Sequence, residues 1–302
     1  MSTQVALPRV SPAARLAQRA NRGLRASTQF ARRKPLGFLG VAICSIAIVL
    51  ALLPGVFVTE DPNFGGNYQD ALQGPSASHW LGTDEHGRDT WSRIVAGART
   101  SLTVSFIAIG MGSISGFLLG IVSGYFGGWV DLIMQRVVDS MMAFPGILLA
   151  LTLVSVFGGG MKAVVIAVGI VFIPGALRIT RGTTLSSKQN VYVDAARVIG
   201  ASSLRIMVRH VLPNVLAPFI VVASVALGSA ILIEASLSYL SMGVPPPYPS
   251  WGRMLSGGAA QYAMVAPWTV IAPGVAISVL VLGFNLFGDA LRDIWDPRLR
   301  GR

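Results

Sequence analysis

Long apolar segments alternate with short polar segments along most of this chain. A helix of about 20 apolar residues crosses the hydrocarbon layer of a membrane. Six segments meet this requirement or approach it: 36–58, 102–124, 140–160, 163–177, 215–242 and 265–288. The fourth has only 15 residues, although Lys162 and Arg178 at its ends can lengthen it by snorkelling. The pattern predicts an all-α polytopic membrane protein with six transmembrane helices.

The distribution of Lys and Arg predicts how these helices are oriented, because basic residues concentrate in cytoplasmic loops. With the N-terminus inside, 19 of the 24 basic residues fall in inner segments, and eight of those belong to the tail at residues 1–35. Without the fourth helix, the basic segment 190–214 would lie outside, against this rule. We therefore expect six helices with both termini in the cytoplasm.

Composition supports a membrane protein. Of the 302 residues, 53% are hydrophobic and 12% are charged, against about 25% charged in an average soluble domain. The net charge of +11 does not indicate a nucleic-acid binder, because the basic residues lie in short segments between apolar ones instead of on one folded surface. Cys44 is the single cysteine, so no disulfide can form within the chain.

The motifs of several enzyme classes are missing. No Gly-Lys dipeptide occurs, and a phosphate-binding P-loop requires one. No serine stands in a Gly-x-Ser-x-Gly turn, and the three histidines lack the spacing of a zinc-protease helix. We expect no catalytic residue in this chain.

Residues 190–214 form a polar segment between two apolar ones, and its apolar positions follow a helical period on either side of Gly200. Ser202 or Ser203 can cap the second helix through its hydroxyl. Pro213 suits the first turn of the helix that follows. We predict two short amphipathic helices about a glycine. They form either a docking ledge for another protein or simply an amphipathic surface loop.

The same segment resembles the EAA loop of ABC importer membrane subunits, the loop that contacts the ATPase subunits. The resemblance rests on Asp194-Ala195-Ala196, then Gly200, then Leu212-Pro213. Two positions depart from the motif: Asp replaces its leading Glu, and His210 stands where Ile is usual. The coupling residues that the resemblance implies are Asp194, Ala195, Ala196, Gly200, Ala201, Leu212 and Pro213.

Further blocks at residues 81–89, 97–102 and 284–297 follow in the order of one family. Together they resemble the permeases of the dipeptide, oligopeptide and nickel group, over roughly residues 36–300. This implies a type I ABC importer permease architecture in a bacterial plasma membrane. The implied partners are a homologous second permease, two ATPase subunits that bind ATP and Mg²⁺, and an external solute-binding protein, with no cofactor in this chain.

The implied cargo is a dipeptide or oligopeptide, with nickel or another small solute as the alternative within the family. An ion-coupled secondary transporter is the rival from another class. Such transporters usually show internal repeats with broken helices at matching positions, and the sequence shows no convincing repeat. A structural membrane scaffold is a third interpretation, favoured only if the protein has no substrate pathway.

This topology divides the chain into a basic tail at 1–35, a first transmembrane helix at 36–58, an outer loop at 59–99, a five-helix core at 100–288 and a C-terminal tail at 289–302. The outer loop should end in an amphipathic helix, because Trp91, Ile94, Val95 and Ala98 share a helical face. By resemblance, this loop either contacts the binding protein, through Asp84, Arg88 and Asp89, or covers the pore mouth.

A metal site in the outer loop is a weaker interpretation. His79, His86 and the nearby acids are ligand types for a transition metal. The alternating oxygen ligands of an EF-hand are absent, and we predict no metal site.

Three other features point to helix packing and to transport. Gly112, Gly116, Gly120 and Gly124 recur at every fourth position, which creates a groove for a neighbouring helix. Prolines at 145, 174 and 273 should kink or break their helices. Glu234 lies within an apolar segment and is a functional hypothesis by default: it either lines the substrate path or is a rim carboxylate with a local partner.

Overall fold

The computed structural model describes residue 32 and residues 34–256 and 261–295. Most of the basic tail and the last seven residues of the C-terminal tail lie outside the described residues. The described part is helical, apart from connecting loops and an isolated bridge between Thr83 and Asp89. Its α-helices are α2 (Pro35–Leu52), α3 (Pro54–Phe57), α4 (Thr90–Phe126), α5 (Gly128–Met142), α6 (Gly146–Val156), α7 (Gly160–Lys188), α8 (Val191–Val198), α9 (Ser203–Ile206), α10 (Leu212–Tyr239), α11 (Trp251–Met254) and α13 (Trp268–Trp295).

Two shorter elements complete the described secondary structure. A 3-10 turn, η1, covers Tyr68–Asp70 in the outer segment. A π-helical turn, η2, covers Met207–Val211 and joins α9 to α10 without a break.

Five described helices are long and apolar enough to cross a membrane: α2, α4, α7, the continuous stretch Ser203–Tyr239, and α13. A sixth crossing results if the bent pair α5 and α6 counts as one. The prediction of an all-α polytopic protein is confirmed. The short fourth segment is the N-terminal half of α7, which has 29 residues and continues through Pro174.

The third predicted span is broken at Pro145, as predicted, although its bounds differ because α5 already begins at Gly128. In place of one helix over residues 140–160, α5 and α6 meet at an angle of 94°. Pro145 stands directly before α6, where it lacks an amide hydrogen and disfavours helical backbone in the preceding residue. The chain therefore turns at Pro145, and α6 keeps only 11 residues.

The second span begins earlier than predicted. α4 starts at Thr90 and has 37 residues, so the predicted boundary at 99/100 falls inside a helix. Asp89 caps this helix by accepting a hydrogen bond from the Ser92 amide at 2.8 Å. At 1.5 Å per residue, α4 is about 55 Å long, which exceeds the hydrocarbon layer of about 30 Å. Its amphipathic first turns belong to the predicted outer loop at residues 59–99, which we call the outer segment.

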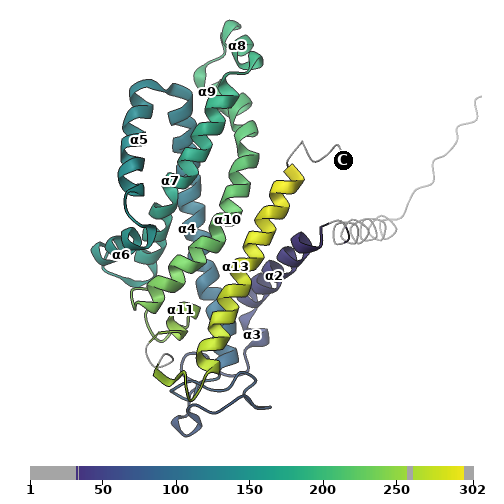
Figure 1. Cartoon of the computed structure of the whole chain (residues 1–302), viewed down its shortest axis with the longest axis vertical. Helices are drawn as coiled ribbons and strands as arrows, with labels where there is room; N and C mark the ends of the chain where they lie inside the picture. Colours follow the sequence, from purple (N-terminus) through teal and green to yellow (C-terminus); the bar gives the residue numbers. More distant parts are fainter. Residues whose placement is uncertain (1–31, 33, 257–260, 296–302) are drawn as a thin grey trace, which may run out of the picture.

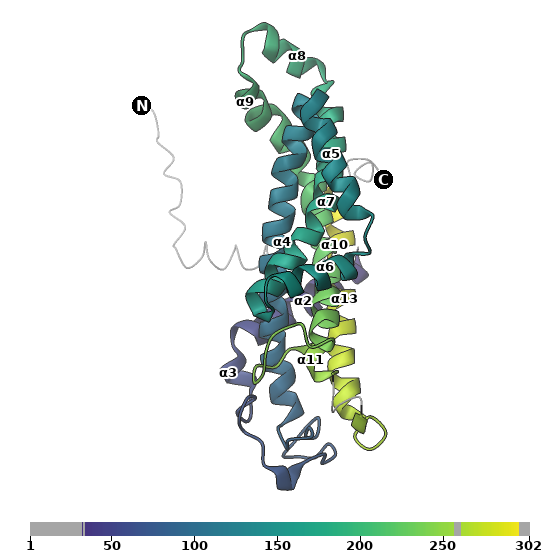
Figure 2. The ribbon, with the colours of Figure 1, turned by 90° about the vertical axis from the view of Figure 1, so that its left-hand side faces the viewer.

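The two described ends of the chain meet at one place. Lys34 Nζ, beside the start of α2, lies 2.8 Å from the Asp293 carboxylate near the end of α13. The loop that carries α8 and the segment before α4 lie at opposite ends of the elongated bundle (Figures 1 and 2). This arrangement agrees with an even number of membrane crossings.

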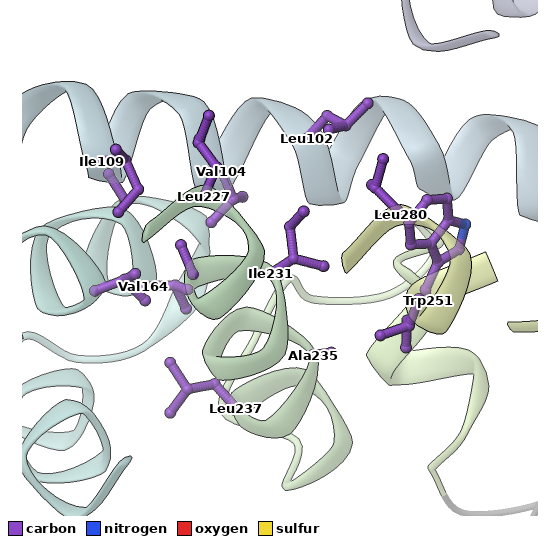
Figure 3. Packing of buried hydrophobic residues seen from close by; sticks show 14 of the residues in the cluster. Leu102, Val104, Ile109, Val164, Leu227, Ile231, Ala235, Leu237, Trp251 and Leu280 are labelled. Carbon is purple, nitrogen blue, oxygen red and sulfur yellow. The ribbon is translucent and has the colours of Figure 1, made fainter. Parts of the chain in front are cut away.

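The core forms where α4, α7, α10 and α13 pack together. Ile231 of α10 is fully buried at its centre, with Leu102 and Val104 of α4 and Leu280 of α13 in the same cluster (Figure 3). Trp251 of α11 completes the cluster and donates a hydrogen bond from Nε1 to the Ile94 carbonyl at 2.9 Å.

The glycine series of α4 packs along α7. A Cβ at Gly112 would overlap the Gly169 carbonyl, one at Gly116 would lie 2.5 Å from the Ile173 carbonyl, and one at Gly120 would lie 2.7 Å from that of Leu177. A Cβ at Gly124 would lie 2.8 Å from the Thr184 side chain. The partner helix of the predicted groove is therefore α7 of the same chain.

Candidate functional site

The loop at residues 190–214 packs on the ends of α4 and α10 that lie farthest from the segment before α4. Four of its apolar side chains are buried, and they contact three residues of α4 and one of α10. The loop contributes Val193, Ala196, Ile206 and Val211, and the helices contribute Phe117, Ile121, Tyr125 and Val215. We call these eight residues the apolar seat.

The local backbone of the loop follows the sequence closely. α8 ends one residue before Ile199, and Gly200 adopts a φ of +83°, a left-handed conformation that favours glycine. The Ser202 hydroxyl accepts a hydrogen bond from the Arg205 amide at 3.4 Å at the start of α9. Pro213 lies in the first turn of α10. Two helices flank Gly200 as predicted, but the second is not short. It runs from α9 through η2 into α10 as the continuous stretch Ser203–Tyr239, so Pro213 begins no separate helix.

The opposite face of the loop exposes large apolar side chains. Val191 is 84% exposed, Val198 87%, Ile199 84% and Leu204 68%. Their spacing places Val191 and Val198 on one face of α8. Large exposed apolar side chains gathered on one short segment are typical of a protein interaction site. We call these four residues the ledge face.

Two tyrosines fasten the loop to the bundle. Tyr192 Oη accepts a hydrogen bond from Asn214 Nδ2 at 3.0 Å and lies 3.4 Å from Ser187 Oγ, so it joins both ends of the loop. The Tyr125 carbonyl accepts a hydrogen bond from Lys188 Nζ at 2.8 Å. The Arg197 guanidinium lies 6.0 Å from the centre of the Tyr125 ring, within the range of a cation–π contact.

The residues implied for coupling fall on different sides of the loop. Ala196 is 5% exposed and belongs to the seat, whereas Ala195 is exposed. Asp194 is exposed and pairs with Arg197 at 2.9 Å. Ala201 and Leu212 are half-buried beside the seat, and Pro213 is exposed.

Tyr125, Phe117 and Ile121 were not singled out from the sequence. They recur at every fourth position of α4, beside the glycine series. This spacing indicates an apolar face. It does not indicate that a loop more than 60 residues later would cover that face.

In the outer segment, the charged residues implied for binding-protein contact form hydrogen bonds and ion pairs within this chain. Asp84 accepts hydrogen bonds from Arg88 Nε and from the Arg88 amide, at 2.8 and 3.0 Å, and its carboxylate lies 3.3 Å from Arg93 Nε. Asp89 caps α4 and lies 3.3 Å from His79 Nδ1. Because Asp84 and Asp89 are 8% and 2% exposed, they offer little surface to another protein.

The outer segment also brings Asp84, Glu85 and His86 together, with one potential metal-ligand atom of each within 4.8 Å of the others. The Asp84 carboxylate already pairs with two arginines, which compensate its charge. This arrangement does not favour a bound cation.

Glu234 is fully buried in α10. Its Oε1 accepts a hydrogen bond from Ser238 Oγ at 2.7 Å, and its Oε2 has no hydrogen-bond partner among the described residues. The side chain thus points into the bundle of this chain. A role in the substrate path stays a prediction.

A large cleft opens between α7, α10 and α13, with a volume of about 700 Å³. Its walls are mainly apolar. Four polar side chains line it: Ser113, Ser229, Asp289 and Arg292. The cleft has the size and the sparse polar groups of a small-molecule site.

Comparison with known proteins gives a consistent result. Residues 116–301 match the model of the family described as binding-protein-dependent transport system inner membrane component. The dipeptide transport system permease protein DppC of Alkalihalophilus pseudofirmus is 42% identical over 89% of this chain and 88% of its own length. The glutathione transport system permease protein GsiD of Pectobacterium atrosepticum is 42% identical over 86% of this chain and 88% of its own length.

A solved structure of the MetNI methionine ABC transporter, in an inward-facing conformation, has a similar chain. The TM-score is 0.52 at 17% sequence identity, and the match covers 67% of this chain and 96% of the other. At this identity the likeness concerns the fold alone.

Proposed function

This chain belongs to the family of binding-protein-dependent transport system inner membrane components, and we propose that it is one of two permease subunits in an ATP-driven peptide importer. The single observation that carries this proposal is the two-sided loop at residues 190–214. One face of the loop packs on α4 through the apolar seat. The ledge face, which points away from the helix bundle, is apolar and exposed.

The ledge face is the proposed docking surface for an ATPase subunit. A motor subunit moves the membrane helices only if a rigid element carries force across the subunit boundary. The seat supplies that rigidity, because Val193, Ile206 and Val211 are essentially fully buried beneath the loop. ATP and Mg²⁺ are assigned to the ATPase subunits, and this chain is assigned no catalytic step.

This assignment places the loop and both termini in the cytoplasm, and the segment before α4 outside. The contact between Lys34 and Asp293 supports termini on one side. A membrane-impermeant maleimide tests the orientation. Ser203→Cys should react only in inside-out vesicles, and Ala77→Cys only in intact cells. Cys44 is buried, so the parent chain serves as the unlabelled control, and the reverse pattern would overturn the orientation.

A peptide is the proposed cargo, since relatives at about two-fifths identity along most of their length are named for dipeptide and glutathione transport. The cleft between α7, α10 and α13 is a candidate wall of the pathway. Its Asp289 and Arg292 side chains offer opposite charges that suit the two ends of a peptide. Deleting the gene for this chain from its own host should abolish uptake of labelled dipeptide or glutathione. Restoring the gene should return that uptake. Unchanged peptide uptake with lost nickel uptake would favour nickel as the cargo.

Docking is tested by purifying the importer from membranes through a tag on this chain. The double variant Val198→Asp and Ile199→Asp should lose the ATPase subunits while retaining the second permease, because two charges are placed on the ledge face. Retention of the ATPase at the wild-type level would overturn the proposed docking surface. Ser186→Asp, exposed on α7, is the matched control and should leave the complex intact.

A further inference from the structure

α5 has little apolar contact with the rest of the chain. Within the described part of the protein, Val138 is the one buried residue of this 15-residue helix. Its apolar residues otherwise face outward: Trp129 is 78% exposed and Ile133 61%. Hydrophobic packing inside this chain therefore contributes little to the position of α5.

A partly buried ion pair between Asp131 and Arg181 joins α5 to α7. Arg181 Nε and Nη2 donate to the two oxygens of Asp131 at 2.5 and 2.6 Å. Ser123 Oγ of α4 donates to the same carboxylate at 2.5 Å. The side chains of Asp131 and Arg181 are 18% and 31% exposed. A two-point contact of this kind fixes direction as well as distance, so one carboxylate ties three helices together.

A glycine pair and a bend bound α5. Gly127 precedes it and Gly128 is its first residue, with φ of +66° and +53°, and neither has an atom within 4 Å of the position a Cβ would take. At the other end, α5 meets α6 at 94°. The Asp131 contacts are therefore a polar link from α5 to α4 and α7.

The two neighbours of α5, α4 and α7, are joined to the loop at 190–214. α7 ends at Lys188, whose side chain binds the Tyr125 carbonyl, and Tyr125 is part of the apolar seat. The glycine contacts hold α4 against α7 over several turns. A displacement of the loop is thus transmitted to α4 and α7, from which Ser123 and Arg181 reach Asp131.

We propose that the Asp131–Arg181 pair is the mechanical tie that makes α5 follow the loop at residues 190–214. α6 is held independently, because its Ala150 and Val154 are fully buried in the core. This inference rests on the proposed function, because the loop moves only if an ATPase docks on it. Asp131 and Arg181 are positioning residues, and neither is assigned a contact with the peptide.

A second ion pair on the same two helices provides a matched control. Arg178 Nη2 contacts Asp139 Oδ1 at 2.5 Å through one hydrogen bond, and both side chains are nearly half exposed, at 45% and 49%. Exposed pairs contribute little, since water screens them and long side chains lose entropy. Asp139→Asn should therefore leave transport within about twofold of the wild type.

The test uses the complete importer in proteoliposomes with its binding protein. Asp131→Asn and Arg181→Gln should each lower peptide uptake about tenfold, while ATP hydrolysis stays within about threefold of the wild type. The number of ATP molecules hydrolysed per peptide then rises. A residue that serves only folding would lower both rates together, in proportion to the amount of complex.

The charge exchange Asp131→Arg with Arg181→Asp re-forms the pair in reverse and should restore at least about a third of wild-type uptake. Arg181→Lys keeps the charge but loses the two-point geometry, so it should show an intermediate ratio of ATP to peptide. If Arg181→Lys and Asp131→Asn both import peptide at the wild-type ratio, the inference is overturned. An exchange variant that assembles fully without regaining uptake also overturns it.

These outcomes are distinct from failure of the proposed function. A wild-type importer that hydrolyses ATP without moving peptide contradicts the proposed function. A wild-type importer that moves peptide, together with variants at 131 and 181 that do so equally well, contradicts the tie alone.

Discussion

Ala195 and Ala196 are neighbours in the sequence, yet they face opposite sides of α8. Ala196 is 5% exposed and packs in the apolar seat beneath the loop, while Ala195 is exposed on the turn that presents Val191 and Val198. Small side chains are thus placed at both positions for different reasons. One position limits how closely the loop approaches α4, and the other limits how closely a partner approaches the loop.

Enlarging each alanine should separate these two roles. Ala196→Phe should lower the free energy of unfolding by about 1–3 kcal/mol, because it overpacks a filled site. Ala195→Phe should leave that free energy unchanged and reduce the ATPase subunits that copurify. Thermal unfolding of the permease pair and quantitative copurification measure the two effects. An equal loss of stability in both variants would contradict the division.

Gly200 should tolerate a side chain poorly because of its backbone, since a Cβ there would lie in open space. At φ of +83°, Gly200→Ala should cost about 1 kcal/mol and loosen α8 against the seat. Faster hydrogen exchange in residues 191–206 measures this loosening. Gly200→Asn should be milder, because Asn adopts left-handed backbone more readily.

Gly182→Ala is the control for that experiment. Gly182 lies within α7 and also has open space around it, but its backbone is helical. Alanine is the better helix former, so this variant should be neutral or stabilising. If Gly182→Ala and Gly200→Ala behave alike, backbone conformation is not the cause.

The contact between α4 and α7 predicts a different pattern. Gly112→Ala places a methyl group onto the Gly169 carbonyl, and a clash with backbone cannot be relieved by a rotamer change. We expect a loss of about 1–3 kcal/mol. Gly110→Ala, two residues away on the same helix with open space around it, should show no loss. Detergent-solubilised unfolding midpoints compare the two, and similar midpoints would argue against close packing as the reason for the glycine series.

A substitution at Glu234 distinguishes its two interpretations, a residue of the substrate path or a carboxylate with a local partner. Glu234→Gln keeps the shape and an acceptor for Ser238, so uptake should stay within about threefold of the wild type if the carboxylate serves the interior of the bundle. If it holds the charged amino end of a peptide, uptake of peptides should fall far more than that of the same peptides with a blocked amino end. Uptake of both substrate forms by this variant is the measurement.

Much of the helical organisation could be predicted from the sequence. The helices on either side of Gly200, the hydroxyl cap at Ser202 and the break at Pro145 were all expected, because each depends on the conformational preferences of a few consecutive residues. The separate helix start at Pro213 was wrong, because one helix continues from Ser203 to Tyr239. The extent of the third span was also not predicted, since α5 begins at Gly128, ahead of the predicted start at residue 140.

The candidate site was predicted only where it depends on consecutive residues. The residues of the loop are consecutive, so their helical faces follow from periodicity. The seat beneath them comes from Phe117, Ile121 and Tyr125 on α4, and the tie comes from Asp131 and Arg181, which are 50 residues apart. Nothing in either local sequence specifies the other.

By itself the sequence determined which segments are helical and apolar, where the chain turns at glycine and proline, and that the loop at 190–214 has one apolar face in each short helix. Those properties depend on backbone preference and on a period of about 3.6 residues. Only the tertiary structure decided that α7 fills the glycine groove of α4, that Ala196 faces inward and Ala195 outward, and that Arg181 reaches Asp131. Such contacts join residues distant in sequence, and they are selected by which helices fit against one another.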